Sequence, residues 1–231
     1  AYEIYQCDWS SDVCSSDLKA ALGFYYQAAQ SVFGSVYFQS VAALCRKGGH
    51  IVKIDTWTVD GGQGPQDYLV IWTSEGEVVV YQGLSFQITV GTTGWMQLVG
   101  VYFIGKPISQ RCTVKFGGDL LMLSDRGIFP ISKALQTATI NRAIALTDRI
   151  EPTYVAQAQQ LYFTFGWQME LFTPLQLLIV SLPTTPYTQY AMQFQSGGWS
   201  SFSGWNITSM LSWQNQFYIG ESTTVKIGRA H

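Results

Sequence analysis

A hairpin pattern recurs along this chain and limits the folds that it can adopt. In each copy, two short apolar segments flank a turn, which is rich in Gly, Asp, Glu or Ser in three copies and is a longer loop through Pro183 to Pro186 in the other. This pattern is typical of antiparallel strand pairs. The clearest copies have their turn glycines at Gly76 and Gly127. The four copies are 68–72 with 78–81, 119–123 with 128–131, 177–182 with 190–194, and 216–219 with 224–225.

Further strand candidates lie between the hairpins. Together they predict small sheets that recur about every forty to fifty residues, which is typical of β-propeller blades. One such sheet buries too little surface alone, so neighbouring sheets must stack on it. The sequence therefore predicts an all-β chain, a truncated β-propeller-like repeat of antiparallel blades, with a β-sandwich as the alternative. The additional strand candidates are 50–59, 95–104, 112–116, 161–165 and 199–202.

Two segments depart from the β pattern. Residues around 132–160 lack alternation and are rich in Ala, Gln and Leu, which predicts a helical insertion whose short helices are broken at Pro152. Residues 39–47 are expected to form a short helix that Gly48 and Gly49 stop. We assign no structure to residues 19–38.

The two ends of the chain can be encoded by complementary DNA strands. Residues 12–18 are encoded by GAC GTG TGC TCT TCC GAT CT, and the reverse complement of that string, read from ATC, encodes residues 227–231. Translated sequencing adapter has this pattern, and such segments carry no information on the fold. We therefore expect residues 1–18 to be adapter-derived and disordered and 225–231 to be an adapter-derived tail. Residues 19–224 would then form one incomplete propeller-like domain.

Composition argues against several classes of function. Charged residues make up 12% of the chain, hydrophobic residues 47%, and the net charge is −2. Nucleic-acid binding through a basic face is therefore not expected, whereas low charge suits surfaces that pack against other subunits. The longest apolar run, 177–182, is too short to span a membrane. Cys45 and Cys112 lie far apart and outside any CxxC pair, so we expect buried free thiols.

Catalytic and metal-binding patterns are sparse. Apart from His231 in the adapter-derived tail, His50 is the one histidine. No GxSxG, GxGxxG or P-loop pattern is present, and zinc sites need several closely spaced His or Cys residues. We therefore expect a protein that is not an enzyme, without catalytic, cofactor-binding or metal-binding residues and without a cofactor.

Acidic residues leave two alternatives open. Glu75 and Glu77 flank a turn, where solvation is the simpler interpretation, and Asp119 and Asp125 are expected to shape their hairpin. A carboxylate dyad built from such residues would make the chain a propeller-borne glycan hydrolase or lyase. The loop at 60–67 offers two carboxylates for calcium, but it lacks the EF-hand spacing, and an ordered Gly-rich turn is favoured.

A Gly- and aromatic-rich segment near the C-terminus also has two interpretations. Trp199, Phe202 and Trp205 could stack on sugars, as in a carbohydrate-binding propeller that recognises a host surface. That interpretation predicts exposed aromatic side chains with Asn, Gln or Asp beside them. The preferred interpretation is that these residues open a blade strand and pack between blades.

Several segments resemble a family of bacteriophage virion proteins. The resemblance begins at TWTVDGGQGPQDY and SEGEV and ends with a "GGW…F…GWN" motif at 197–206. It covers most of 46–219 and does not extend to 19–44. The matching segments are 56–68, 74–78, 99–107, 115–120, 130–135 and 197–206.

Proteins of this family are similar to propeller-like components of phage tails and head-to-tail connectors. The resemblance implies a structural role in the virion, and it carries over no catalytic residue. The implied partners are other virion proteins and further copies of the chain in a homo-oligomeric ring around a DNA conduit. Recognition of a specific nucleic-acid sequence and a membrane span are not implied.

Overall fold

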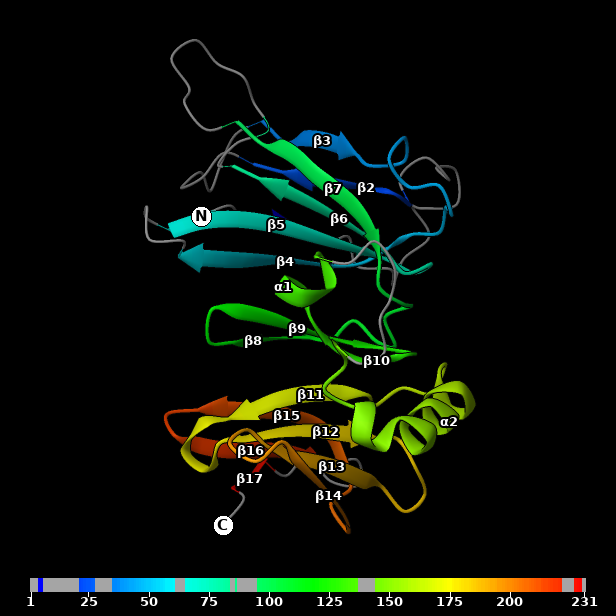
Figure 1. Cartoon of the computed structure of the whole chain (residues 1–231), viewed down its shortest axis with the longest axis vertical. Coiled ribbons are helices and arrows are strands. Elements are labelled where there is room, and N and C mark those ends of the chain that lie inside the picture. Colours follow the sequence, from blue (N-terminus) through cyan, green and yellow to red (C-terminus); the bar gives the residue numbers. More distant parts are fainter. Residues whose placement is uncertain are drawn as a thin grey trace. The chain divides into compact units, whose positions relative to one another are not determined.

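The computed structural model describes residues 4–5, 21–27, 35–60, 65–83, 86, 95–136, 144–221 and 227–229 (Figure 1). The chain divides into two compact units, Ala1–Lys106 and Pro107–His231. All pairings between the described strands are antiparallel, and strands that follow one another in the chain are neighbours in the sheets. The all-β prediction is therefore confirmed, and the described residues show several small sheets and no closed propeller.

The unit Ala1–Lys106 contains two sheets. The predicted hairpin around Gly76 is present, and Gly76 has φ +83°, with the Gly105 carbonyl carbon 2.7 Å from where a Cβ would lie. The predicted helix at 39–47 is wrong, because a strand continues to Ser40 and turns follow it. The strands are β1 (Ile4–Tyr5), β2 (Gly23–Tyr26) and β3 (Tyr37–Ser40) in one sheet, and β4 (Ile51–Asp60), β5 (Pro65–Thr73), β6 (Glu77–Gln82) and β7 (Gln97–Phe103) in the other.

Both faces of β5 and β6 are buried. Ile71 and Val79 point to one face and join a core cluster with Phe24 of β2 and Val41. Side chains alternate between the faces of a strand, so Trp72 points to the opposite face, where it is also fully buried. The uninterrupted apolar runs of β5 and β6 follow from this burial on both sides.

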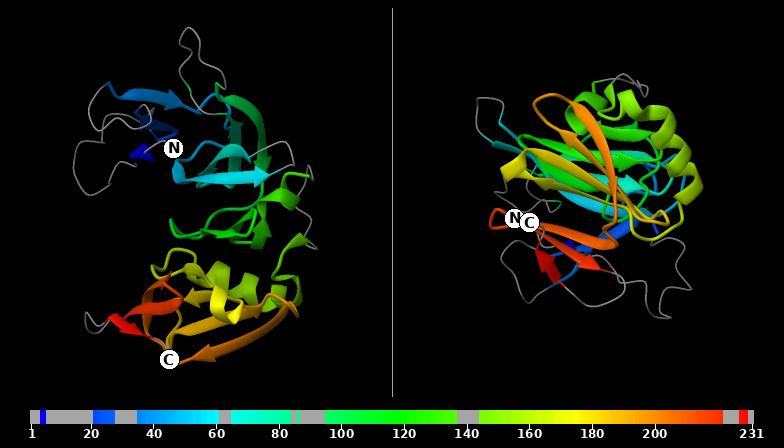
Figure 2. Two further views of the ribbon diagram at one scale, coloured as in Figure 1. Left: turned by 90° about the vertical axis from the view of Figure 1, so that its left-hand side faces the viewer. Right: turned by 90° about the horizontal axis from the view of Figure 1, so that it is seen from below.

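The unit Pro107–His231 contains three sheets (Figures 1 and 2). Each is a meander of consecutive strands, as the hairpin pattern predicts. The strands are β8 (Thr113–Phe116), β9 (Asp119–Ser124) and β10 (Gly127–Pro130); β11 (Gln168–Phe172), β12 (Leu177–Leu182), β13 (Thr188–Gln193) and β14 (Gly198–Ser203); and β15 (Ile207–Trp213), β16 (Gln216–Glu221) and β17 (Ile227–Arg229).

The middle sheet of this unit, β11–β14, is covered on both faces. Leu178 and Val180 of β12 lie in one core cluster with Leu121 of β9. Ile179 points to the opposite face and lies in a second cluster with Met210 of β15 and Phe217 of β16. The three sheets are therefore stacked in chain order, with two apolar layers between them.

Helices occur in the region where the insertion is predicted. They are α1 (Ile131–Ala134), η2 (Asp148–Ile150) and α2 (Glu151–Leu161), and a 3-10 turn, η3 (Thr173–Leu175), precedes β12. Pro152 does not break a helix: it lies in the first turn of α2, where its missing N–H costs no hydrogen bond. None of the described helices is long and apolar enough to cross a membrane.

One strand prediction and one turn prediction near the C-terminus are wrong. The strand expected at 161–165 is displaced, because α2 continues to Leu161 and β11 begins at Gln168. The fourth predicted hairpin is present in part: β16 pairs antiparallel with β17, but Gly220 and Glu221, expected in the turn, belong to β16. β16 also pairs with β15, across a turn at Gln214 and Asn215. Both turn residues, Gln214 and Asn215, are left-handed, with φ 48° and 59°. The turn was not predicted because it contains no glycine, which is the usual sequence signal for a left-handed hairpin turn.

The adapter prediction falls mostly on residues that lie outside the described ones. Within 1–18 and 225–231 the structure describes β1 and β17 alone. Cys45 and Cys112 are free and buried, as expected from the sequence.

Candidate functional site

Glu77 is the clearest departure from the expected role of the acidic residues. It is buried, not solvated, and its two carboxylate oxygens accept hydrogen bonds from the backbone N–H groups of Arg46 and Lys47, both at 3.0 Å. The carboxylate therefore fixes the segment before β4 against β6. Burial, together with the charge of Glu77, raises the pKa of the Cys45 thiol to about 11, which keeps that thiol unreactive.

The other carboxylates also serve local structure. Glu75 forms an ion pair with Lys106 at 2.8 Å. Asp119 accepts hydrogen bonds from the backbone N–H groups of Leu120 and of Ser132, at 2.8 and 3.0 Å, and so holds the first turn of α1. The expectation that Asp119 shapes its own hairpin is thus incomplete, because its main partner lies on α1.

The remaining catalytic and metal candidates are dispersed. His50 is exposed just before β4, where its backbone N–H donates to Ser74 Oγ at 3.1 Å. Half of the loop considered for calcium, residues 61–64, lies outside the described residues, and Asp67 accepts a hydrogen bond from the Thr58 hydroxyl at 2.7 Å. Within the described part of the chain, no group of three or more His, Cys, Asp or Glu side chains is placed to hold a metal ion.

The three aromatic residues considered for sugar stacking pack between sheets. Trp199 is half-buried on the core of the second unit, and its Nε1–H donates to the Leu146 carbonyl at 2.9 Å. Phe202 and Trp205 pack edge to face, with ring centroids 4.9 Å apart, beside Phe217 of β16. Their positions agree with the preferred interpretation of this segment.

Polar side chains join the first strands of the three stacked sheets. Arg111, which precedes β8, donates from Nη1 to Gln168 Oε1 of β11 at 3.2 Å and to the Thr208 carbonyl of β15 at 2.9 Å. Gln168 Oε1 also accepts from the Met210 N–H at 2.8 Å, while Gln168 Nε2 donates to the Met210 carbonyl at 2.5 Å. The Gln168 amide thus pairs with β15 as a strand backbone would.

Glu170 continues this contact two residues along β11. Its carboxylate accepts a hydrogen bond from the Ser212 N–H at 3.1 Å. Burial raises the pKa of Glu170, and the hydrogen bond from Ser212 opposes this shift. Sequence reasoning missed Arg111, Gln168 and Glu170, because their partners lie in β11 and β15 and not in neighbouring turns.

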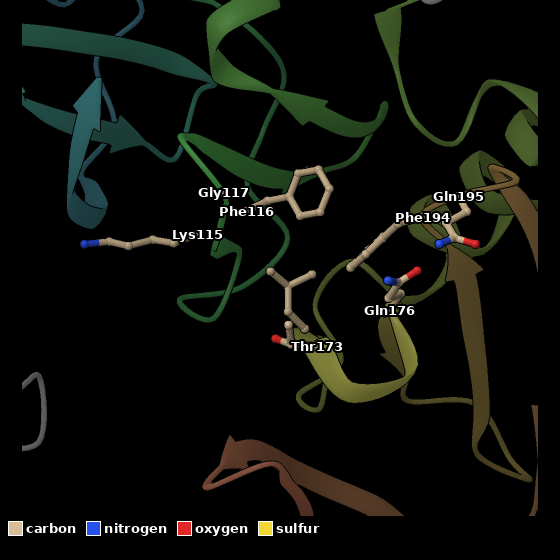
Figure 3. A pocket seen from close by; sticks show the side chains of 8 residues that line it. Lys115, Phe116, Gly117, Thr173, Gln176, Phe194 and Gln195 are labelled. Atoms are coloured by element: carbon tan, nitrogen blue, oxygen red, sulfur yellow. The ribbon is translucent and has the colours of Figure 1, made fainter. Parts of the chain in front are cut away.

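An open pocket lies at one end of the first two stacked sheets of this unit (Figure 3). Its volume is about 470 Å³. Its floor contains Phe116 and Phe194, whose ring centroids are 4.7 Å apart. Exposed polar side chains from the loops surround these rings. We call it the Phe116–Phe194 pocket, and it is lined by Lys115, Phe116, Gly117, Leu171, Thr173, Gln176, Phe194 and Gln195.

A second hollow, of about 290 Å³, has a different character. It lies between β11–β14 and β16, and apolar side chains line it throughout. Trp205 and Phe217 form part of its wall. A ligand with hydroxyl groups would lose water there, and the indole N–H of Trp205 is the one hydrogen-bonding group among the lining side chains. The hollow is lined by Phe172, Leu175, Leu177, Ile179, Phe202, Trp205 and Phe217.

Comparisons with known proteins assign no family to the chain. No protein-family model matches it, and no curated protein matches it significantly.

Proposed function

We propose that this chain is a non-catalytic structural subunit of a bacteriophage virion, built from propeller-like blades that pack against neighbouring tail or connector subunits. The resemblance to phage virion proteins supports the proposal. Its matching segments fall on strands of both units: 56–68 on β4 and β5, 115–120 on the β8–β9 hairpin, and 197–206 on β14.

The stacking of sheets supports a propeller-like architecture over a β-sandwich. A sandwich has two sheets, each with one face toward solvent. In the second unit, the sheet β11–β14 has a core cluster on each face, through Val180 on one side and Ile179 on the other. A sheet that is covered on both faces by its neighbours in the chain is what a row of blades requires.

The Arg111 contacts are the observation that carries the propeller-like part of the proposal. In a propeller, the sheets are arranged around a central channel, so the same strand of each blade lies nearest the axis. Arg111 joins the start of β8 to β11 and β15, which are the first strands of three successive sheets. First strands that converge on one guanidinium group agree with blades arranged around an axis.

Exposed apolar side chains support packing against other subunits. Leu211 and Trp213 of β15 are 56% and 57% exposed. They alternate with Met210, which is buried against β11–β14, so they point to the outer face of their sheet. That face presents apolar side chains of the kind that the inner sheets use for stacking, and a homo-oligomeric ring would cover it with a further copy.

Three of the four carboxylates considered for catalysis have structural partners. Glu75 pairs with Lys106, and Glu77 and Asp119 hold backbone N–H groups. A glycosidase needs two carboxylates that flank one substrate, and the described acidic residues do not line either of the two pockets described above. This arrangement supports a non-catalytic role.

The genes that flank this one provide the test. Sequencing outward from the gene should show portal, terminase or tail genes beside it if the chain is a virion subunit. Neighbours that serve sugar metabolism or secretion would overturn the virion proposal.

A further inference from the structure

We propose that the Phe116–Phe194 pocket binds a neutral saccharide. This inference goes beyond a structural role and does not depend on the virion proposal. It rests on the apolar floor of the pocket, the uncommitted polar groups at its rim, and the absence of fixed charge directed into it.

The floor of the pocket is aromatic and rigidly supported. The rings of Phe116 and Phe194 lie at an interplanar angle of 58°. Phe116, Leu171 and Phe194 are half-buried and pack on the main core cluster of the second unit, so the floor is already formed without a ligand. The C–H face of a pyranose ring is apolar and packs well on such aromatic surfaces.

The rim supplies neutral hydrogen-bonding groups. Thr173, Gln176 and Gln195 are exposed, and their side chains make no hydrogen bond within the part of the chain that the structure describes. Figure 3 shows them around the two rings. Side-chain amides both donate and accept hydrogen bonds, which matches sugar hydroxyl groups. The backbone of Gln176 is held in place, because its main-chain carbonyl accepts the Phe194 N–H at 3.0 Å.

The charge of the lining favours a neutral ligand. No carboxylate or imidazole group lines the pocket. Lys115 is the one cationic residue of the lining, and Figure 3 shows its amine directed away from the rings. An acidic sugar would therefore find no cation at the floor. The volume of about 470 Å³ lies within the range usual for small-ligand sites.

The polar rim distinguishes this pocket from one that would bind an apolar side chain of a partner protein. Apolar docking needs only the floor, as in the hollow beside Trp205, whose lining is aliphatic and aromatic. A saccharide needs both the floor and the rim. Substitutions in each part therefore distinguish the two kinds of ligand.

Saturation-transfer NMR with the full chain tests the proposal. The probes are maltotriose, cellotriose and N,N′-diacetylchitobiose, with affinity expected on the order of 1 mM for so open a site. Gln176→Ala combined with Gln195→Ala should weaken binding about tenfold, as the loss of two hydrogen bonds predicts. Phe194→Leu, which keeps an apolar floor but removes the aromatic face, should weaken it as well.

Gln214→Ala is the matched control. Gln214 is also exposed and left-handed, with φ 48° against 53° for Gln176, but it lies in the β15–β16 turn, so the variant should bind like the wild type. Thermal unfolding should confirm that each variant folds. Absence of transfer to all three probes, or binding that the double variant retains in full, would overturn the proposal.

Discussion

At the scale of single residues, Glu77 should contribute far more to the stability of the fold than the nearby Glu75. Glu77→Gln replaces one carboxylate oxygen with an NH₂ group, which would face the backbone N–H of Arg46 or Lys47. Losing a buried charge-assisted hydrogen bond should lower the free energy of unfolding by about 2 kcal/mol. Glu75→Gln removes a partly exposed ion pair with Lys106 and should cost less than about 1 kcal/mol. Chemical denaturation of both variants measures the difference, and equal losses would contradict it.

Glu170 should make stability depend on pH. Its pKa is raised in the folded state by burial, so the folded chain holds this proton more tightly than the unfolded chain does. The contribution of this group is therefore most favourable below the unfolded pKa of about 4.3, and it declines as the pH rises through the folded pKa.

Glu170→Gln keeps an oxygen that can accept the Ser212 N–H and removes the titration. We expect this variant to be more stable than the wild type at neutral pH and to lack the decline. Thermal unfolding between pH 4 and pH 8 tests this, with Glu221→Gln, at an exposed strand end, as the control. A wild-type slope in Glu170→Gln would show that another group causes the decline.

At the scale of elements, the contact between β11 and β15 should depend on Gln168. Gln168→Leu leaves the N–H and carbonyl of the buried Met210 without their partner. We expect the free energy of unfolding to fall by an amount on the order of 3 kcal/mol. Gln193→Leu is the control, because Gln193 Oε1 is buried without a hydrogen-bond partner, so its removal should be neutral or stabilising. Urea denaturation of the two variants decides between these outcomes, and similar losses would contradict the assigned role of Gln168.

The same strands show where prediction from the sequence succeeds and where it fails. The hairpins at Gly76 and Gly127 were predictable because apolar runs and a glycine turn are local signals. β11 was misplaced because Gln168 and Glu170 put polar groups on a buried face, and their partners on β15 are 42 residues away. The Phe116–Phe194 pocket was not predicted either, since loops from three hairpins meet there.

At the scale of the whole molecule, the outer face of β15 and β16 should drive self-association. Leu211 lies opposite Tyr218 in the register of the two strands, and the rings of Trp213 and Tyr218 lie 6.5 Å apart, so the three side chains form one apolar surface. Covering Leu211 and Trp213 with a second copy would contribute about 1.5–3 kcal/mol for each side chain.

Leu211→Ser combined with Trp213→Ser should therefore weaken association by about two to four orders of magnitude. Phe163→Ser is the matched control, because Phe163 is 97% exposed but lies in the loop after α2, and this variant should associate like the wild type. Sedimentation velocity over a range of concentrations measures the oligomeric state. A wild-type chain that stays monomeric throughout, or an equal effect of Phe163→Ser, would remove this face as the site of ring contacts.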